Sequence, residues 1–134
     1  MGFAALADAA FRHFEEAGGG HLVGITSLAA VRASGGAPAY SASKTFASSY
    51  LAGLRHRALG AGLPITVTEV RPGFVDTAMA QGEDLFWVAT PEEAASQIAE
   101  AIERRRRVAY VTRRWRMVAA LLNVLPGWLY RRLT

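Results

Sequence analysis

The chain has 134 residues, of which 51% are hydrophobic and 19% are charged, and it contains no cysteine. This length suits one domain with a core of its own, and the apolar content excludes an intrinsically disordered chain. The lack of cysteine excludes a disulfide scaffold and a zinc–thiolate site, and we expect no metal.

The net charge of +4 is divided unevenly along the chain. Residues 1–103 carry a balance of −5, whereas residues 104–134 contain nine arginines and no acid. Such a basic end is typical of a segment that meets a membrane surface, a nucleic acid or an acidic partner; a solvated end is the alternative. Fourteen of the fifteen cationic side chains are arginine, so Lys44 is the only lysine.

Helix and strand patterns alternate along the chain. Apolar residues at three- and four-residue spacing indicate helices, and short β-branched runs indicate strands. Thr90-Pro91-Glu92-Glu93 is typical of a helix start, with a capping hydroxyl, a proline and two acids. The predicted elements are a helix over 3–16, a strand over 21–26, a loop over 28–38, a helix over 39–60, a strand over 65–70, a turn at 71–73, an irregular segment over 76–90, a helix to about 106, a strand over 108–111 and a helix over 113–132 broken near Pro126-Gly127.

This alternation predicts an α/β fold with a parallel sheet covered by helices on both faces. Three strands make a narrow sheet whose outer edge nothing in the sequence covers. We therefore expect a portion of the fold to be missing, with residues 1–112 forming part of a larger domain and residues 113–134 a basic amphipathic end.

The apolar stretch within that end, Val118 to Leu129, is too short to cross a membrane. Arginines and tryptophans flank it, so it is suited to lie in a membrane interface, and packing against the sheet or a partner subunit is the alternative. The acidic body argues against nucleic-acid binding. We expect a cytoplasmic protein, with membrane association through residues 113–134 as a further expectation.

Three polar residues carry the candidate chemistry. Tyr40 and Lys44 are four residues apart at the start of a predicted helix, which places both side chains on one face. An ammonium beside a phenol favours the phenolate and lowers the tyrosine pKa, so that the tyrosine can exchange a proton with an alcohol or carbonyl oxygen. Ser27 follows a strand, at the sheet edge where α/β proteins bind ligands.

The complete pattern resembles the short-chain dehydrogenase/reductase family. It comprises Ser27, then Tyr40-Ser41-Ala42-Ser43-Lys44, a strand, and Arg71-Pro72-Gly73-Phe74-Val75-Asp76-Thr77. The resemblance covers most of the chain and implies the C-terminal part of a doubly wound, Rossmann-like parallel sheet. It also implies an NAD(P)-dependent oxidoreductase that reduces a carbonyl or oxidises an alcohol.

The resemblance implies a role for each matching residue. Tyr40 would be the general acid or base, Lys44 would lower its pKa and bind the nicotinamide ribose, and Ser27 would orient the substrate carbonyl. The cofactor-binding positions would be Tyr40, Lys44, Pro72, Gly73, Val75 and Thr77, with Thr77 reaching the carboxamide or pyrophosphate. The resemblance further implies a homo-oligomer that forms through the helices over 3–16 and 39–60. It also implies a small-molecule substrate, which would be covered by Met79, Phe86, Trp87 and Val88.

The sequence also departs from the family. The Gly-rich phosphate turn and the ribose selector are absent, so NAD and NADP cannot be distinguished, and a further catalytic asparagine would precede Met1. Gly18-Gly19-Gly20 follows a helix and precedes a strand, the wrong order for a phosphate loop. We therefore expect a truncated chain that is inactive alone; the alternative is a non-enzymatic remnant that serves as an interaction or membrane-surface module.

Overall fold

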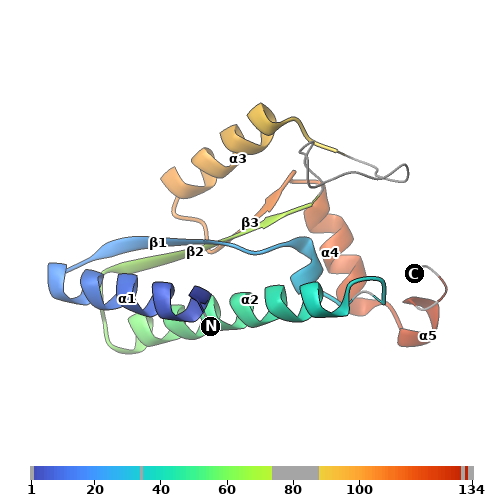
Figure 1. The fold of residues 1–134 in the computed structure, drawn as a ribbon. Coiled ribbons are helices and arrows are strands. Elements are labelled where there is room, and N and C mark those ends of the chain that lie inside the picture. The colour runs from blue at the N-terminus through green and yellow to red at the C-terminus, as the bar shows by residue number, and fades with distance from the viewer. Residues whose placement is uncertain (1, 34, 74–87, 131, 133–134) are drawn as a thin grey trace.

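A computed structural model describes residues 2–33, 35–73, 88–130 and 132. Figure 1 shows two long helices lying along one face of a small sheet and a third helix on the other face. The elements are α1 (Gly2–Ala17), β1 (Gly20–Ile25), the 3₁₀ turn η1 (Leu28–Ala30), α2 (Pro38–Gly60), β2 (Ile65–Pro72), α3 (Pro91–Glu103), β3 (Val108–Val111), α4 (Trp115–Val124) and α5 (Gly127–Tyr130).

The three strands form a parallel sheet in the order β1-β2-β3. Residues 20–25 of β1 pair with residues 65–70 of β2, and residues 69–72 of β2 pair with residues 108–111 of β3. Parallel strands need a crossover between them, and α2 and α3 provide the two crossovers on opposite faces of the sheet. The predicted α/β class with a parallel sheet covered on both faces is confirmed.

The core lies in two layers, one on each face of the sheet. Between the sheet and α1–α2, Phe11 and Leu51 are completely buried and pack with Val67 of β2. On the opposite face, Val70 and Val111 pack against Ala94 of α3. Successive side chains of β2 therefore point alternately into the two layers, as strand geometry requires.

Two glycines are needed where the chain is crowded or sharply bent. At Gly24, a Cβ atom would overlap Leu51, so the absence of a side chain lets α2 approach β1. Gly18 ends α1 with φ +80, and the amide of Gly19 returns to the carbonyl oxygen of Phe14 at 2.8 Å. The glycine stop predicted after the first helix is confirmed.

Several predicted boundaries are wrong, the first of them because of a contact that is distant in sequence. β2 continues through Arg71 and Pro72 because these residues pair with Tyr110 and Val111 of β3. The helix begun at Thr90 ends at Glu103, three residues earlier than expected, because Arg105 takes φ +49. The C-terminal helix begins at Trp115 instead of residue 113, and the break predicted near Pro126-Gly127 lies between Val124 and Gly127.

A further difference lies in the loop predicted over 28–38, where Leu28–Ala30 form a 3₁₀ turn. The hydroxyl of Thr90 caps α3 as predicted, accepting a hydrogen bond from the amide of Glu93 at 3.1 Å. Residues 76–87 of the predicted irregular segment, including Met79, Phe86 and Trp87, lie outside the described residues.

We expect Phe11→Ala to lower the free energy of unfolding by about 3–5 kcal/mol, because the ring is fully buried between α1 and α2. Urea denaturation followed by far-ultraviolet circular dichroism measures the change. Glu16→Ala, an exposed position on the same helix, is the matched control and should stay within about 0.5 kcal/mol of the parent. Similar losses in both variants would contradict the described core.

Candidate active site

Ser27 lies immediately beyond the carboxyl end of β1, as the sequence predicts. Its backbone is extended, and its side-chain oxygen accepts a hydrogen bond from the amide of Ala29 at 3.1 Å, which caps η1. The hydroxyl is half-buried. Because Oγ acts as an acceptor in this contact, its O–H hydrogen remains able to donate to a substrate oxygen.

Tyr40 and Lys44 lie in the first two turns of α2. Pro38 begins this helix, and proline suits a first helical position because its φ is preset. The Lys44 ammonium lies 5.6 Å from the centroid of the Tyr40 ring, and the tyrosine is 48% exposed. The structure therefore brings together the cation and the phenol that the spacing predicts on one face, and leaves the phenol accessible to a ligand.

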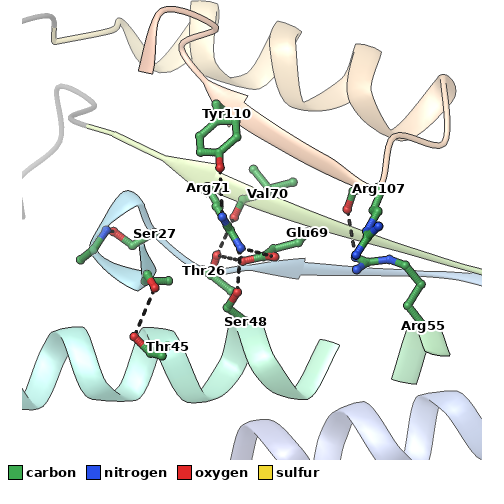
Figure 2. A network of polar contacts seen from close by, with 12 residues as sticks. Thr26, Ser27, Thr45, Ser48, Arg55, Glu69, Val70, Arg71, Arg107 and Tyr110 are labelled. Atoms are coloured by element: carbon green, nitrogen blue, oxygen red, sulfur yellow. Dashed lines mark hydrogen bonds and ion pairs between the residues drawn. The ribbon is translucent and has the colours of Figure 1, made fainter. Parts of the chain in front are cut away.

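The turn that follows Ser27 is attached to the helix that carries Tyr40 and Lys44. The hydroxyl of Thr45, the residue after Lys44, donates to the carbonyl oxygen of Ala30 at 3.3 Å, and η1 packs against α2 (Figure 2). The candidate serine and the candidate tyrosine–lysine pair thus belong to one packed unit.

Pro72 is the last residue of β2, and Gly73 follows it. Because β1 and β2 are parallel, both residues lie at the same edge of the sheet as Ser27. The amide of Gly73 donates to the carbonyl oxygen of Val111 at 2.6 Å. A Cβ atom at Gly73 would overlap the indole of Trp115, a side chain that is 2% exposed, so only glycine fits against this ring. Val75 and Thr77, the other two candidate cofactor-binding residues, lie outside the described residues.

An ion pair within β2 lies next to these positions, and its further hydrogen bonds reach neighbouring elements (Figure 2). Arg71 donates two hydrogen bonds to the carboxylate of Glu69, from Nε at 2.8 Å and from Nη2 at 3.0 Å. Glu69 is 2% exposed, and it also accepts a hydrogen bond from the Thr26 hydroxyl at 2.8 Å. Arg71 further contacts the hydroxyls of Ser48 and Tyr110, at 2.9 and 3.0 Å.

The network keeps both charged groups ionised. Burial raises the pKa of the Glu69 carboxyl, but hydrogen bonds from Arg71 and Thr26 and the charge of Arg71 outweigh burial and hold that pKa below its ordinary value. Burial lowers the pKa of Arg71, and the contacts with Glu69 more than reverse this change. A desolvated pair satisfied in this way stays charged, and the removal of either partner is costly.

Sequence reasoning missed this pair. We name the pair, together with Thr26, Ser48 and Tyr110, the Glu69–Arg71 network. The available signal was an acid and a base two residues apart in a β-branched run, because that spacing places both on one face of a strand. A second buried cation was also missed. Arg55 of α2 donates to the carbonyl oxygens of Val67 at 3.1 Å and Arg107 at 3.0 Å.

Within the described residues, no group of three His, Asp or Glu side chains is arranged to hold a metal ion. The described side chains at the candidate site are a hydroxyl, a phenol and an ammonium, carried by Ser27, Tyr40 and Lys44. This set can donate and accept protons at a substrate oxygen.

Comparison with known proteins matches residues 1–86 to the protein family described as short chain dehydrogenase. An uncharacterized oxidoreductase of Myxococcus xanthus is 42% identical over 78 residues, which cover 58% of this chain and 30% of that protein. An uncharacterized oxidoreductase of Mycobacterium tuberculosis is 30% identical over 118 residues, which cover 87% of this chain and 47% of that protein.

Solved structures share the fold. A short chain dehydrogenase from Burkholderia cenocepacia in complex with NADP superposes with a TM-score of 0.75 and 25% identity, over 92% of this chain and 52% of that one. A short-chain dehydrogenase from Sphingobium yanoikuyae in complex with NADPH gives a TM-score of 0.71 at 23% identity, over 93% and 53% of the two chains. The chain therefore spans about half the length of these structures.

We expect Glu69→Gln to lower the free energy of unfolding by about 3 kcal/mol at neutral pH, because it leaves the Arg71 guanidinium, which is 18% exposed, without its counter-charge. Since the folded-state pKa of Glu69 is lowered, the stabilisation is present above the ordinary carboxyl value of 4.5 and is lost as the pH falls through the folded pKa. The difference between variant and parent should therefore shrink in acid.

Urea midpoints at pH 7 and in the acid range test this expectation. Tyr110→Phe is the matched control, because it removes one neutral hydroxyl from Arg71 and should cost about 1 kcal/mol. A Glu69→Gln protein as stable as its parent at pH 7 would show that the network contributes nothing to the fold.

Proposed function

Because the chain belongs to the short-chain dehydrogenase family, we propose that it supplies the catalytic residues of an NAD(P)-dependent oxidoreductase acting on a carbonyl compound or an alcohol. The observation that carries the proposal is the exposed Tyr40 phenol with the Lys44 ammonium over its ring, on a helix packed against the turn that follows Ser27.

In the reducing direction, Tyr40 donates its phenolic proton to the substrate oxygen as that oxygen gains negative charge; in the oxidising direction, it takes the proton back. The Lys44 ammonium stabilises the phenolate that Tyr40 becomes. The Ser27 hydroxyl, whose oxygen is held by the amide of Ala29, donates its hydrogen to the same substrate oxygen and orients it.

A nicotinamide cofactor, either NAD or NADP, supplies the hydride when bound. The relatives that were solved with NADP or NADPH support this cofactor class. We propose that Tyr40, Lys44, Pro72, Gly73, Val75 and Thr77 hold its nicotinamide end. The described residues are compatible with that end, since Pro72 and Gly73 are half-buried at the carboxyl end of β2, the edge of the parallel sheet at which β1 leads into Ser27.

The described residues do not fit the pyrophosphate end. A phosphate-binding turn leads from a strand into a helix, whereas Gly18–Gly20 lead from α1 into β1 and serve to end α1. We therefore propose that the 134-residue chain alone does not turn over substrate, and that catalysis needs the part of the fold that binds the pyrophosphate.

The alternative is a non-enzymatic interaction or membrane-surface module. The exposed apolar side chains and the arginines of the C-terminal segment favour it, because neither is needed for hydride transfer. An activity assay distinguishes the oxidoreductase from this alternative, because the function of a non-enzymatic module does not depend on the Tyr40 hydroxyl.

We also propose that the chain associates with a second copy through α1 and α2. Leu6 and Leu59 are each 73% exposed on these helices, and Phe46 is 48% exposed and stacks on Tyr50. Large apolar side chains on neighbouring helices are typical of helical subunit interfaces.

In the protein that contains this chain and binds the cofactor, Tyr40→Phe should lower kcat about 100-fold or more and leave the Kd for the cofactor within about twofold, because only the proton donor is lost. Oxidation of NADH or NADPH with a panel of aldehydes and ketones measures the rate. Lys44→Arg should also fail, because guanidinium is a broad fork instead of a compact ammonium.

Tyr50→Phe, on the same helix but facing α1, is the matched control and should keep the parent rate. Turnover retained by Tyr40→Phe would remove Tyr40 from the mechanism. Reading the coding DNA upstream of Met1 in frame tests whether a pyrophosphate-binding segment precedes it.

For the subunit interface, Phe46→Glu should convert a dimer to a monomer in light scattering after gel filtration, because it places a charge in an apolar contact. Val124→Glu adds the same charge at a 76% exposed position on α4 and should leave the dimer intact. A parent protein that is monomeric at high concentration would contradict the proposed interface.

A further inference from the structure

The C-terminal segment exposes several large apolar side chains. On α4, Met117, Leu121 and Val124 are 75%, 56% and 76% exposed, and Trp128 of α5 is 59% exposed. Their spacing of three and four residues places the α4 members on one side of that helix. On the other side, Trp115 and Ala119 are buried against the body of the protein. We name the four exposed residues the C-terminal apolar face.

This face is held in a fixed orientation and is not a loose end. Arg32, in the loop after η1, donates to the carbonyl oxygens of Leu122 and Leu125 at 2.7 and 2.6 Å, where α4 ends. A cation at the carboxyl end of a helix also interacts favourably with the helix dipole. Its guanidinium lies 4.3 Å from the ring centroid of Tyr130, whose hydroxyl donates to the carbonyl oxygen of Ala33 at 2.8 Å.

Positive charge surrounds the face. All nine arginines of residues 104–134 occur without a single acid in that stretch. Arg113, Arg114 and Arg116 are exposed at the amino end of α4, and Arg132 is exposed beyond α5. Glu100 of α3 is the acid that pairs with this group, through Arg113. The described part of the segment thus presents apolar side chains between three guanidiniums at one end and that of Arg132 at the other.

We propose that the C-terminal apolar face docks on an anionic lipid bilayer. Met117, Leu121, Val124 and Trp128 enter the boundary between headgroups and acyl chains, and the flanking arginines contact the lipid phosphates. The helix lies in the plane of the surface. No helix among the described residues combines the length and the apolar character that crossing a bilayer demands.

Charge complementarity favours lipid over the other occupants of such a face. If a second copy of this chain docked on the face, its apolar residues would match, but the arginines of the two copies would lie close together and repel each other. Among the described residues β1 pairs with β2 alone, and β3, on which α4 packs, is the opposite edge of the sheet. A strand added at the β1 edge would therefore not cover the C-terminal apolar face.

Vesicle sedimentation of the full chain tests the proposal. We expect the protein to pellet with vesicles containing about one-third phosphatidylglycerol at about 0.05 M NaCl. At about 0.5 M NaCl, the fraction of protein bound to the vesicles should fall at least about tenfold. Purely zwitterionic phosphatidylcholine vesicles should bind at least about tenfold less. Leu121→Glu should abolish pelleting, whereas Ala95→Glu, which adds the same charge at an exposed position on α3 outside this face and outside the proposed subunit interface, should pellet like the parent.

Tryptophan fluorescence gives a second readout that does not depend on a destabilised variant. Acyl-brominated lipids in anionic vesicles should quench a component of the emission that is missing in Trp128→Phe. Failure to pellet at low salt, pelleting unaffected by Leu121→Glu, or concentration-dependent self-association lost in Leu121→Glu without lipid binding would each overturn the proposal. None of these outcomes involves catalysis, so they do not bear on the proposed oxidoreductase activity.

Discussion

The ion pair between Glu69 and Arg71 is the constraint around which this small sheet is arranged. A carboxylate and a guanidinium taken out of water are stable only if every hydrogen-bonding position is satisfied. Two hydrogen bonds join Glu69 to Arg71, and three more connect the pair to Thr26 after β1, to Ser48 of α2 and to Tyr110 of β3. The two other strands and the long helix must therefore be in place before the pair is stable.

The same contacts determine where the candidate catalytic groups lie. Ser27 directly follows Thr26, Pro72 directly follows Arg71, and Lys44 is one helical turn before Ser48. Each contact of the network is thus made within a turn of a residue to which we assign a role in the reaction. Stability and site geometry are coupled here because a shift that breaks the network also moves the serine, the lysine or the end of β2.

Sequence reasoning succeeded where the signal is local. The Thr90 cap, the glycine stop after α1 and the proximity of Lys44 to Tyr40 depend on residues a few positions apart. It failed where the determinant is distant in sequence. The extension of β2 is set by β3, about forty residues later, and the fit of Gly73 against Trp115 depends on a helix beyond that strand. The catalytic and cofactor-binding assignments, including Val75 and Thr77, stay predictions.

Arg32 shows how such a distant contact changes the meaning of a segment. In the sequence it is one arginine in a small-residue loop, and the basic end that it contacts is equally compatible with a solvated face. In the structure its guanidinium contacts both the carboxyl end of α4 and the ring of Tyr130. The loop after Ser27 therefore holds the C-terminal segment in place. A merely solvated end gains nothing from this ordering, which costs side-chain and backbone entropy. An apolar face fixed in one orientation is what docking on a flat surface requires, because its residues then enter the surface together.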